Sequence, residues 1–298
     1  VIRTSYTDAI VRSKLNRDVH SESLLKEAGD AIQVLELTGE LRFVSAEIVA
    51  SSVIERMDTR SFLILDLSRV TSIDKSASTL LAELMETLMR QDKTVMLTGA
   101  SGYYRFRTFL DRFLKSHGAS PVLEFADVDR ALEFAEDRLL NEIDTSGKSV
   151  EAIPLEEQPL CRHLDDAELE LLRSTLDEEI YEAGELVCKE GQPADKVYFL
   201  TSGRVSASVR LDPNRRSRLS ASAAGWAFGE SALFKHHTRT ADIIADTRIR
   251  LYSLQPERLW KLETPVATSV KLKLLSNLSE TSMDRMGRMN REIRTLTR

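Results

Sequence analysis

The stretch FGESALFKHHTRTADI, from Phe228 to Ile243, determines how the second half of the chain is interpreted. Gly229 permits close approach of the backbone to a ligand, and ESALF can open a short helix whose first N–H groups favour an anion. Glu230 can accept a hydrogen bond from a hydroxyl, and Arg239 can pair with a phosphate in bidentate fashion. We therefore interpret this stretch as a candidate cradle for an anion that also carries a hydroxyl.

Short polar–apolar segments divided by turns surround this stretch. They are EEIYEAGELVCKEG, KVYFLTSGRVSASVRL and RLSASAAG, with DPN as one of the turns. Regularly spaced short strands of this kind predict a small antiparallel barrel. Helical spacing precedes them in DDAELELLRSTL and returns from Pro256 onward.

The same stretch resembles the phosphate-binding cassette of cyclic nucleotide-binding domains. Upstream, AGELVCKEGQPADKVYFLTSGRV carries that family's Gly-Glu, Glu-Gly, Asp, Tyr-Phe and Gly-x-Val landmarks, so the resemblance covers about residues 158–298. It implies cAMP or cGMP as ligand, with Glu230 on the ribose hydroxyl and Arg239 on the cyclic phosphate. A Thr after the arginine tends to help guanine binding in this family, which indicates cGMP or dual use, while a cAMP-selective site stays open. The implied contact residues are Phe228, Gly229, Glu230, Ser231, Ala232, Arg239 and Thr240.

Two details depart from the family pattern. Trp226 stands where an acidic or polar residue is usual, and Lys235–His237 stand where Gly and Pro are frequent. We expect Trp226 in the core and His236 and His237 in an exposed loop, and we assign no metal site. The alternative is a fold retained without ligand binding.

The first half of the chain shows a different rhythm. IQVLELTGELRF predicts a strand pair or a bulged strand, and SAEIVASSVIERM predicts a helix with Ser45 as its N-cap and Ile48, Val49, Val53 and Met57 on one face. FLILDL (Phe62 to Leu67) and TVMLTG are continuous apolar runs, which suit buried central strands. Amphipathic helices are predicted between and after them, for example KSASTLLAELMETLMRQ, and a final helix capped by Asp127. The βαβαβα order predicts one domain over residues 30–143, with a mixed sheet and helices against it.

FLILDLSRVTSIDKSASTLLAELMETL resembles the STAS domain of bacterial anti-sigma-factor antagonists and of sulfate-type transporter tails. In signalling members the loop reads Asp-Ser-Ser/Thr-Gly, and the first Ser or Thr is phosphorylated. Here the loop is Asp74-Lys75-Ser76-Ala77, so Lys75 occupies the acceptor position and cannot be phosphorylated. Phosphorylation of Ser76 is a weaker alternative, and the simplest interpretation is that Asp74 caps the following helix. The resemblance implies an interaction module.

Composition sets the outer limits. The chain has 298 residues, 42% of them hydrophobic, which suits two folded domains, and its net charge of −6 argues against nucleic-acid binding. Two cysteines favour a cytosolic setting, and no apolar run could span a membrane. The predicted class is α+β: a connecting arm (1–29), a STAS-type mixed sheet (30–143), a linker (144–159), and an antiparallel β-roll or jelly-roll with flanking helices (160–298).

The residues after Gln255 are too few for a helix-turn-helix domain, and they show apolar residues at spacings of three to five. Such a helix could cover the ligand, pair with a second copy, or pack on its own barrel, and we favour a homodimer. The residues concerned are Val266, Val270, Leu274, Leu278, Met283, Met286 and Met289.

Neither half contains a nucleophile–base pair, so no catalytic residue and no cofactor is assigned. The chain begins with Val1, and we interpret it as a regulatory piece of a longer protein. The pair of modules resembles the C-terminal tail of bacterial multidomain glutaminases, and second the cytosolic tail of sulfate-permease-type transporters. The partners this implies are a cyclic nucleotide and an upstream domain of the same protein.

Overall fold

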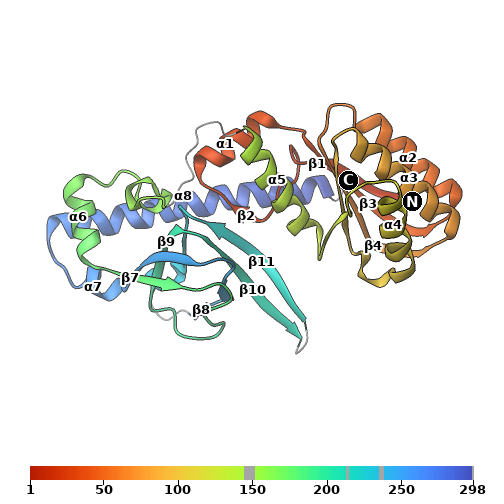
Figure 1. Cartoon of the computed structure of the whole chain (residues 1–298). Coiled ribbons are helices and arrows are strands. Elements are labelled where there is room, and N and C mark those ends of the chain that lie inside the picture. The colour runs from red at the N-terminus through yellow and green to blue at the C-terminus, as the bar shows by residue number, and fades with distance from the viewer. Residues whose placement is uncertain (144–151, 213–214, 235–237, 297–298) are drawn as a thin grey trace. The chain divides into compact units, whose positions relative to one another are not determined.

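The computed structural model describes residues 1–143, 152–212, 215–234 and 238–296, which form two compact units (Figure 1). The first unit takes in residues 1–13, 23–143 and 291–296, and the second takes in residues 14–22 and the described residues from 152 to 290. The segment expected to be a connecting arm is therefore divided between the units and is structured in both. It contributes β1 (Ile2–Thr7), β2 (Leu15–Asn16) and α1 (Val19–Ala28).

The first unit is built on a five-stranded sheet in the order β1-β3-β4-β5-β6. Strand β1 is antiparallel to β3, and the other neighbours are parallel, as a mixed sheet requires. The segment IQVLELTGEL forms one strand with register shifts, which confirms the bulged-strand alternative. The elements are β3 (Ile32–Leu41), α2 (Phe43–Arg56), β4 (Phe62–Ile73), α3 (Lys75–Arg90), β5 (Thr94–Thr98), η1 (Ala100–Gly102), α4 (Tyr104–Ser116), β6 (Leu123–Phe125) and α5 (Val128–Ile143).

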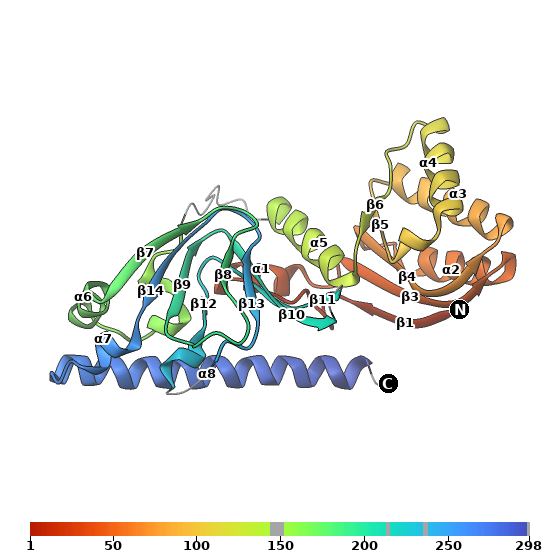
Figure 2. The ribbon, with the colours of Figure 1, turned by 90° about the horizontal axis from the view of Figure 1, so that it is seen from below.

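Helices cover both faces of this sheet. Leu63 and Leu65 of β4 pack in one core with residues of α2, α3 and α4, whereas Phe62 and Ile64 pack in another with residues of α5 (Figure 2). A central strand that is buried on both faces must be apolar throughout, which is why Phe62–Leu67 reads as an uninterrupted run.

The second unit contains two sheets. One has the order β2-β11-β10-β13-β8 and the other β12-β9-β14-β7, and every pairing is antiparallel except that of β2 with β11. The predicted small β-roll is thus confirmed. The strands are β7 (Leu176–Tyr181), β8 (Leu186–Cys188), β9 (Val197–Ser202), β10 (Arg204–Asp212), β11 (Arg215–Ala223), β12 (Ala227–Phe228), β13 (Asp242–Ala245) and β14 (Ile249–Leu254).

The helices of the second unit pack against one sheet of the roll. Leu200 and Leu251 face a core inside the roll, while Val197, Phe199 and Leu254 face a core shared with the helices. The helices are η2 (Leu155–Glu157), η3 (Pro159–Cys161), α6 (Asp166–Ser174), η4 (Glu230–Leu233), α7 (Pro256–Trp260) and α8 (Pro265–Leu296).

The first half of helix α8 packs against the roll of its own unit. Val270, Leu274 and Leu278 are buried in the helix-facing core. Asn277 donates hydrogen bonds to the carbonyl oxygens of Leu160 and Arg162, at 3.0 and 2.7 Å. These contacts bear out the packing alternative for this part of the helix.

Candidate functional site

A cavity of about 230 Å³ lies in the second unit, between the sheet that contains β10 and β11 and the segment that follows β12. It brings together six of the seven residues that the sequence nominated. Those six are Phe228, Gly229, Glu230, Ser231, Arg239 and Thr240, and the other lining residues are Asn16, Cys188, Val205, Ala207, Leu219, Ser220, Ala221, Ser222, Ala241 and Ile243.

Ala232 is the exception. Its side chain is buried in the helix-facing core beside Leu233, and its N–H donates to the carbonyl oxygen of Gly229 at 3.0 Å. The predicted short helix is present as η4, but it is a 3-10 helix of four residues, so its first turn uses this N–H internally. Ala232 therefore supports the cradle from behind and does not line the cavity.

Gly229 occupies a position where only glycine fits. Its backbone has φ +75°, in the left-handed region, and it precedes η4 directly. A Cβ at this position would lie 2.6 Å from Nη1 of Arg239 and 3.1 Å from the carbonyl oxygen of Lys196. The glycine therefore lets the chain turn and lets the guanidinium pass close beneath it.

The Arg239 guanidinium is almost entirely buried, with 4% of its side chain exposed. Nη1 donates to the carbonyl oxygen of Lys196 at 2.8 Å, and the guanidinium carbon lies 5.3 Å from the centre of the Tyr198 ring. Nη2 reaches Asp195 at 3.3 Å, although 71% of the Asp195 side chain is exposed. A buried cation whose carboxylate partner stands in solvent is well placed to accept a second anion.

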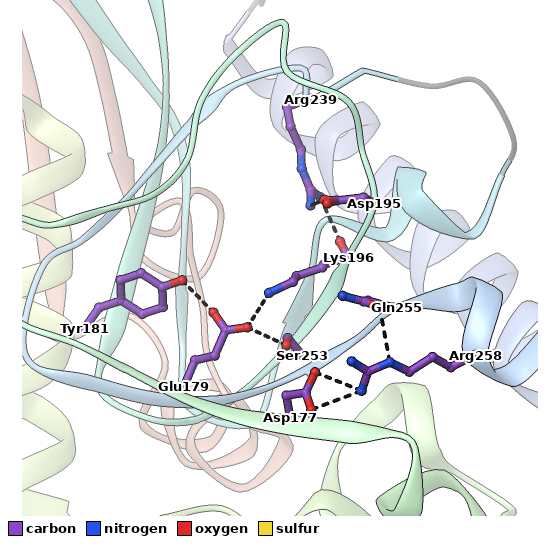
Figure 3. A network of polar contacts seen from close by, with 9 residues as sticks. All are labelled: Asp177, Glu179, Tyr181, Asp195, Lys196, Arg239, Ser253, Gln255 and Arg258. Atoms are coloured by element: carbon purple, nitrogen blue, oxygen red, sulfur yellow. Dashed lines mark hydrogen bonds and ion pairs between the residues drawn. The ribbon is translucent and has the colours of Figure 1, made fainter.

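A polar network fixes the backbone that holds Arg239 (Figure 3). Nζ of Lys196 donates to Glu179 at 2.7 Å, and the same carboxylate accepts from Ser253 and Tyr181, each at 2.6 Å. Burial raises the pKa of Glu179, but these hydrogen bonds more than offset it and leave the pKa below its usual value. The carboxylate is thus ionised at neutral pH and holds Lys196 in place.

A separate polar cluster lies at the start of α7. Arg258 of α7 pairs with Asp177 of β7 at 2.9 Å and donates to Gln255 at 3.2 Å (Figure 3). Strand β14, which carries Ser253, leads directly into Gln255 and α7. Sequence reasoning missed these residues, because charged residues on short strands have no local signal that distinguishes a network from a solvated face.

Trp226 does not obstruct the cavity. It is buried, as predicted, it is not among the lining residues, and its Nε1 donates to the carbonyl oxygen of Arg17 at 2.5 Å. The departure from the family pattern at this position therefore anchors an N-terminal segment. The Lys235–His237 loop lies outside the described residues.

The loop before α3 in the first unit is arranged differently. Oδ1 of Asp74 accepts from the N–H of Ala77 at 2.7 Å, which confirms that Asp74 caps the helix. Lys75 and Ser76 are exposed and are not among the residues that line the cavity of the second unit. Asp66, at the end of the apolar run, is bonded to Ser68 and Thr98.

Comparison with known proteins identifies two protein families in separate parts of the chain. Residues 24–117 match the family described as STAS domain, and residues 178–263 match the family described as cyclic nucleotide-binding domain. The chain joins a STAS domain to a cyclic nucleotide-binding domain.

Two curated relatives extend over most of the chain. Glutaminase 2 of Bradyrhizobium diazoefficiens is 30% identical over 82% of this chain and 38% of its own length. Glutaminase 1 of the same organism is 29% identical over 96% of this chain and 45% of its own length. The chain therefore spans less than half the length of these relatives.

Among solved structures, the N-terminal domain of a transcriptional regulator from Streptomyces coelicolor A3(2) is 28% identical. The match covers 44% of this chain and 94% of that one, with a TM-score of 0.38. No helix in the described ranges has the length and apolar character needed to cross a membrane.

Proposed function

We propose that this chain is a regulatory segment that binds a cyclic mononucleotide in the cavity of its second unit. The observation that carries the proposal is the buried Arg239 guanidinium beneath Gly229, at a cavity that also presents Glu230 and Thr240. In this proposal Arg239 takes the cyclic phosphate and Glu230 takes the ribose hydroxyl. Phe228, Gly229 and Ser231 complete the wall around them.

The size of the cavity favours a small ligand. At about 230 Å³ it lies below the roughly 300–1,000 Å³ of pockets that take drug-sized molecules. A mononucleotide suits this volume better than a cyclic dinucleotide. Thr240 at the cavity supports cGMP or dual use, and cAMP is the competing ligand.

Binding would change the partners of Arg239. A phosphate that approaches Nη2 replaces the exposed Asp195 carboxylate, while the carbonyl oxygen of Lys196 keeps Nη1 in place. We propose that this exchange is passed on through Lys196 and Glu179 to Ser253, and so to α7. Hydrogen exchange of α7 with and without nucleotide measures it, and unchanged α7 amides in a saturated protein would rule this route out.

The STAS domain, in turn, would relay the signal to a partner domain. The two curated relatives favour a glutaminase as the parent protein, which would place the chain in the cytoplasm. A transporter tail is the alternative parent. A homodimer is also proposed, because Met283 and Met286 of α8 are 71% and 63% exposed.

Isothermal titration of the whole chain with cAMP and with cGMP tests the proposal. We expect saturable heat with at least one of them, and its loss in Arg239→Ala. No heat with either nucleotide at high concentration would refute it. A scaffold that only drives oligomerisation predicts instead that the oligomeric state, measured by analytical ultracentrifugation, is the same with and without nucleotide and in Arg239→Ala.

A further inference from the structure

A segment from the N-terminus of the chain forms part of the second unit. This strap, residues 14–22, adds β2 as the edge strand beside β11. The two strands are parallel, with Leu15 paired to Ala221 and Asn16 paired to Ser222. The carbonyl oxygen of Lys14 accepts a hydrogen bond from the N–H of Ala221 at 3.1 Å. The strap thus covers an edge of the roll that would otherwise present unpaired backbone groups.

Side chains also hold the strap in place. Leu15 and Arg17 are buried, and Nε1 of Trp226 donates to the carbonyl oxygen of Arg17. Asp18 then caps the first turn of α1, accepting from the N–H and the hydroxyl of Ser21 at 3.0 and 2.6 Å. These contacts leave the side chain of Asn16 in a defined position.

Asn16 is part of the cavity wall, and the other lining residues lie between 188 and 243. Its Nδ2 donates one hydrogen bond to the carbonyl oxygen of Ala221 at 3.0 Å. Across the described part of the chain, Oδ1 of Asn16 accepts no hydrogen bond. One amide hydrogen and one carbonyl oxygen therefore remain as an adjacent donor and acceptor.

Strand order places Asn16 far from the phosphate end of the cavity. Arg239 shortly precedes β13, whereas Asn16 lies on β2, and β11 and β10 stand between these two strands. Three spacings of about 4.8 Å between neighbouring strands put β2 and β13 roughly 14 Å apart across the sheet. A mononucleotide with its phosphate at Arg239 would direct its base towards Asn16. Among the described side chains of α8, none lines this cavity, and the strap supplies this part of the wall.

We propose that Asn16 is a base-contacting residue that hydrogen-bonds the edge of a purine base. This inference rests on the proposed binding of a cyclic nucleotide. A carboxamide offers a donor and an acceptor side by side, which match N6–H and the neighbouring ring nitrogen of adenine. The same pair matches O6 and N1–H of guanine, so the native residue accepts both bases, in keeping with dual use.

Replacing the amide by a carboxylate separates the two bases. Asn16→Asp offers acceptors only, which suit N1–H and N2–H of guanine but oppose the ring nitrogen of adenine. We expect the ratio of the Kd for cAMP to the Kd for cGMP to rise about tenfold, at the lower end of the discrimination that a bidentate base contact gives. Titration calorimetry of the whole chain with both nucleotides measures the ratio.

Two other variants distinguish this role from a structural one. Trp226→Phe removes the anchor of the strap but keeps the Asn16 amide, so it should weaken both nucleotides alike and leave the ratio unchanged. His20→Ala alters an exposed residue of the same strap and should leave both affinities unchanged. A folded Asn16→Asp variant with the native ratio, or an equal change of ratio in Trp226→Phe, would overturn the inference. Absence of binding in the native chain would instead refute the proposed function itself.

Discussion

The loop at Asp74–Ser76 and the cassette at Phe228–Ile243 look alike in sequence, because each places an acid and small residues before a helical segment. In the structure they have little in common. The Asp74 carboxylate accepts a hydrogen bond from the N–H of Ala77, and Lys75 beside it is exposed. In the cassette the cation is buried, and its carboxylate partner is the one that is exposed. The difference indicates that a binding site is marked by a desolvated charge beside a cavity, and a helix cap by a charge already satisfied within its own turn.

Arg239→Ala should give the largest effect that separates the two loops. Truncating one member of a buried charge pair typically costs about 2–5 kcal/mol, which is a loss of roughly 30-fold or more in nucleotide affinity. Lys75→Ala is the matched control, because Lys75 is exposed and does not line the cavity beside Arg239. Titration calorimetry should show the native affinity in Lys75→Ala. Equal losses in the two variants would mean that the contrast between the loops is wrong.

Gly229→Ala tests the close approach under the cassette. The new Cβ would meet Arg239 Nη1 at 2.6 Å, so we expect roughly tenfold weaker binding in addition to a stability loss of about 1–2 kcal/mol from the left-handed backbone. Gly118→Ala, in the first unit, carries the strain alone, since Gly118 has φ +71° and nothing within 4 Å of its Cβ position. Urea unfolding should show similar stability losses for both, and only Gly229→Ala should alter nucleotide affinity.

What the sequence alone could predict depends on how far apart in the chain the contacting residues lie. The buried strand at Phe62–Leu67 and the cassette around Gly229 and Arg239 are local patterns, and their elements were predicted from the residues themselves. Asn16 could not be found in this way. Its strand has two residues, too few for any periodicity, and it pairs with a strand about 200 residues away.

Local signals also failed where tertiary contacts decide the outcome. Ser45 was predicted as the N-cap of α2, but the helix begins at Phe43 and Ser45 is its third residue, accepting from the N–H of Arg42 at 2.7 Å. Ile48 was placed on the buried face, yet it is exposed, while Ala46 and Ala50 are buried. Small residues face the sheet here because α2 packs closely against it, and hydrophobicity alone does not show this.

Asp74→Ala probes the satisfied member of the comparison. Loss of an N-cap carboxylate typically costs about 1 kcal/mol, so urea unfolding of the first unit should shift by that amount. Asp74→Ser retains a capping oxygen and should restore most of the loss. Nucleotide affinity should be native in both variants. A weaker affinity in Asp74→Ala would show that the loop before α3 contributes to the site after all.

Asp195→Asn gives the smallest expected effect and the most direct test of the exchange at Arg239. In the structure Nη2 of Arg239 reaches Asp195 at 3.3 Å, and a phosphate must compete with this carboxylate. Exposed ion pairs contribute about 0.2–1 kcal/mol, so removing the charge should tighten binding by up to about fivefold. The gain should shrink as salt is raised, because screening already weakens the native pair. Weaker binding in Asp195→Asn would show that Asp195 orients the guanidinium for the ligand, since a residue that only competes with the phosphate cannot help it to bind.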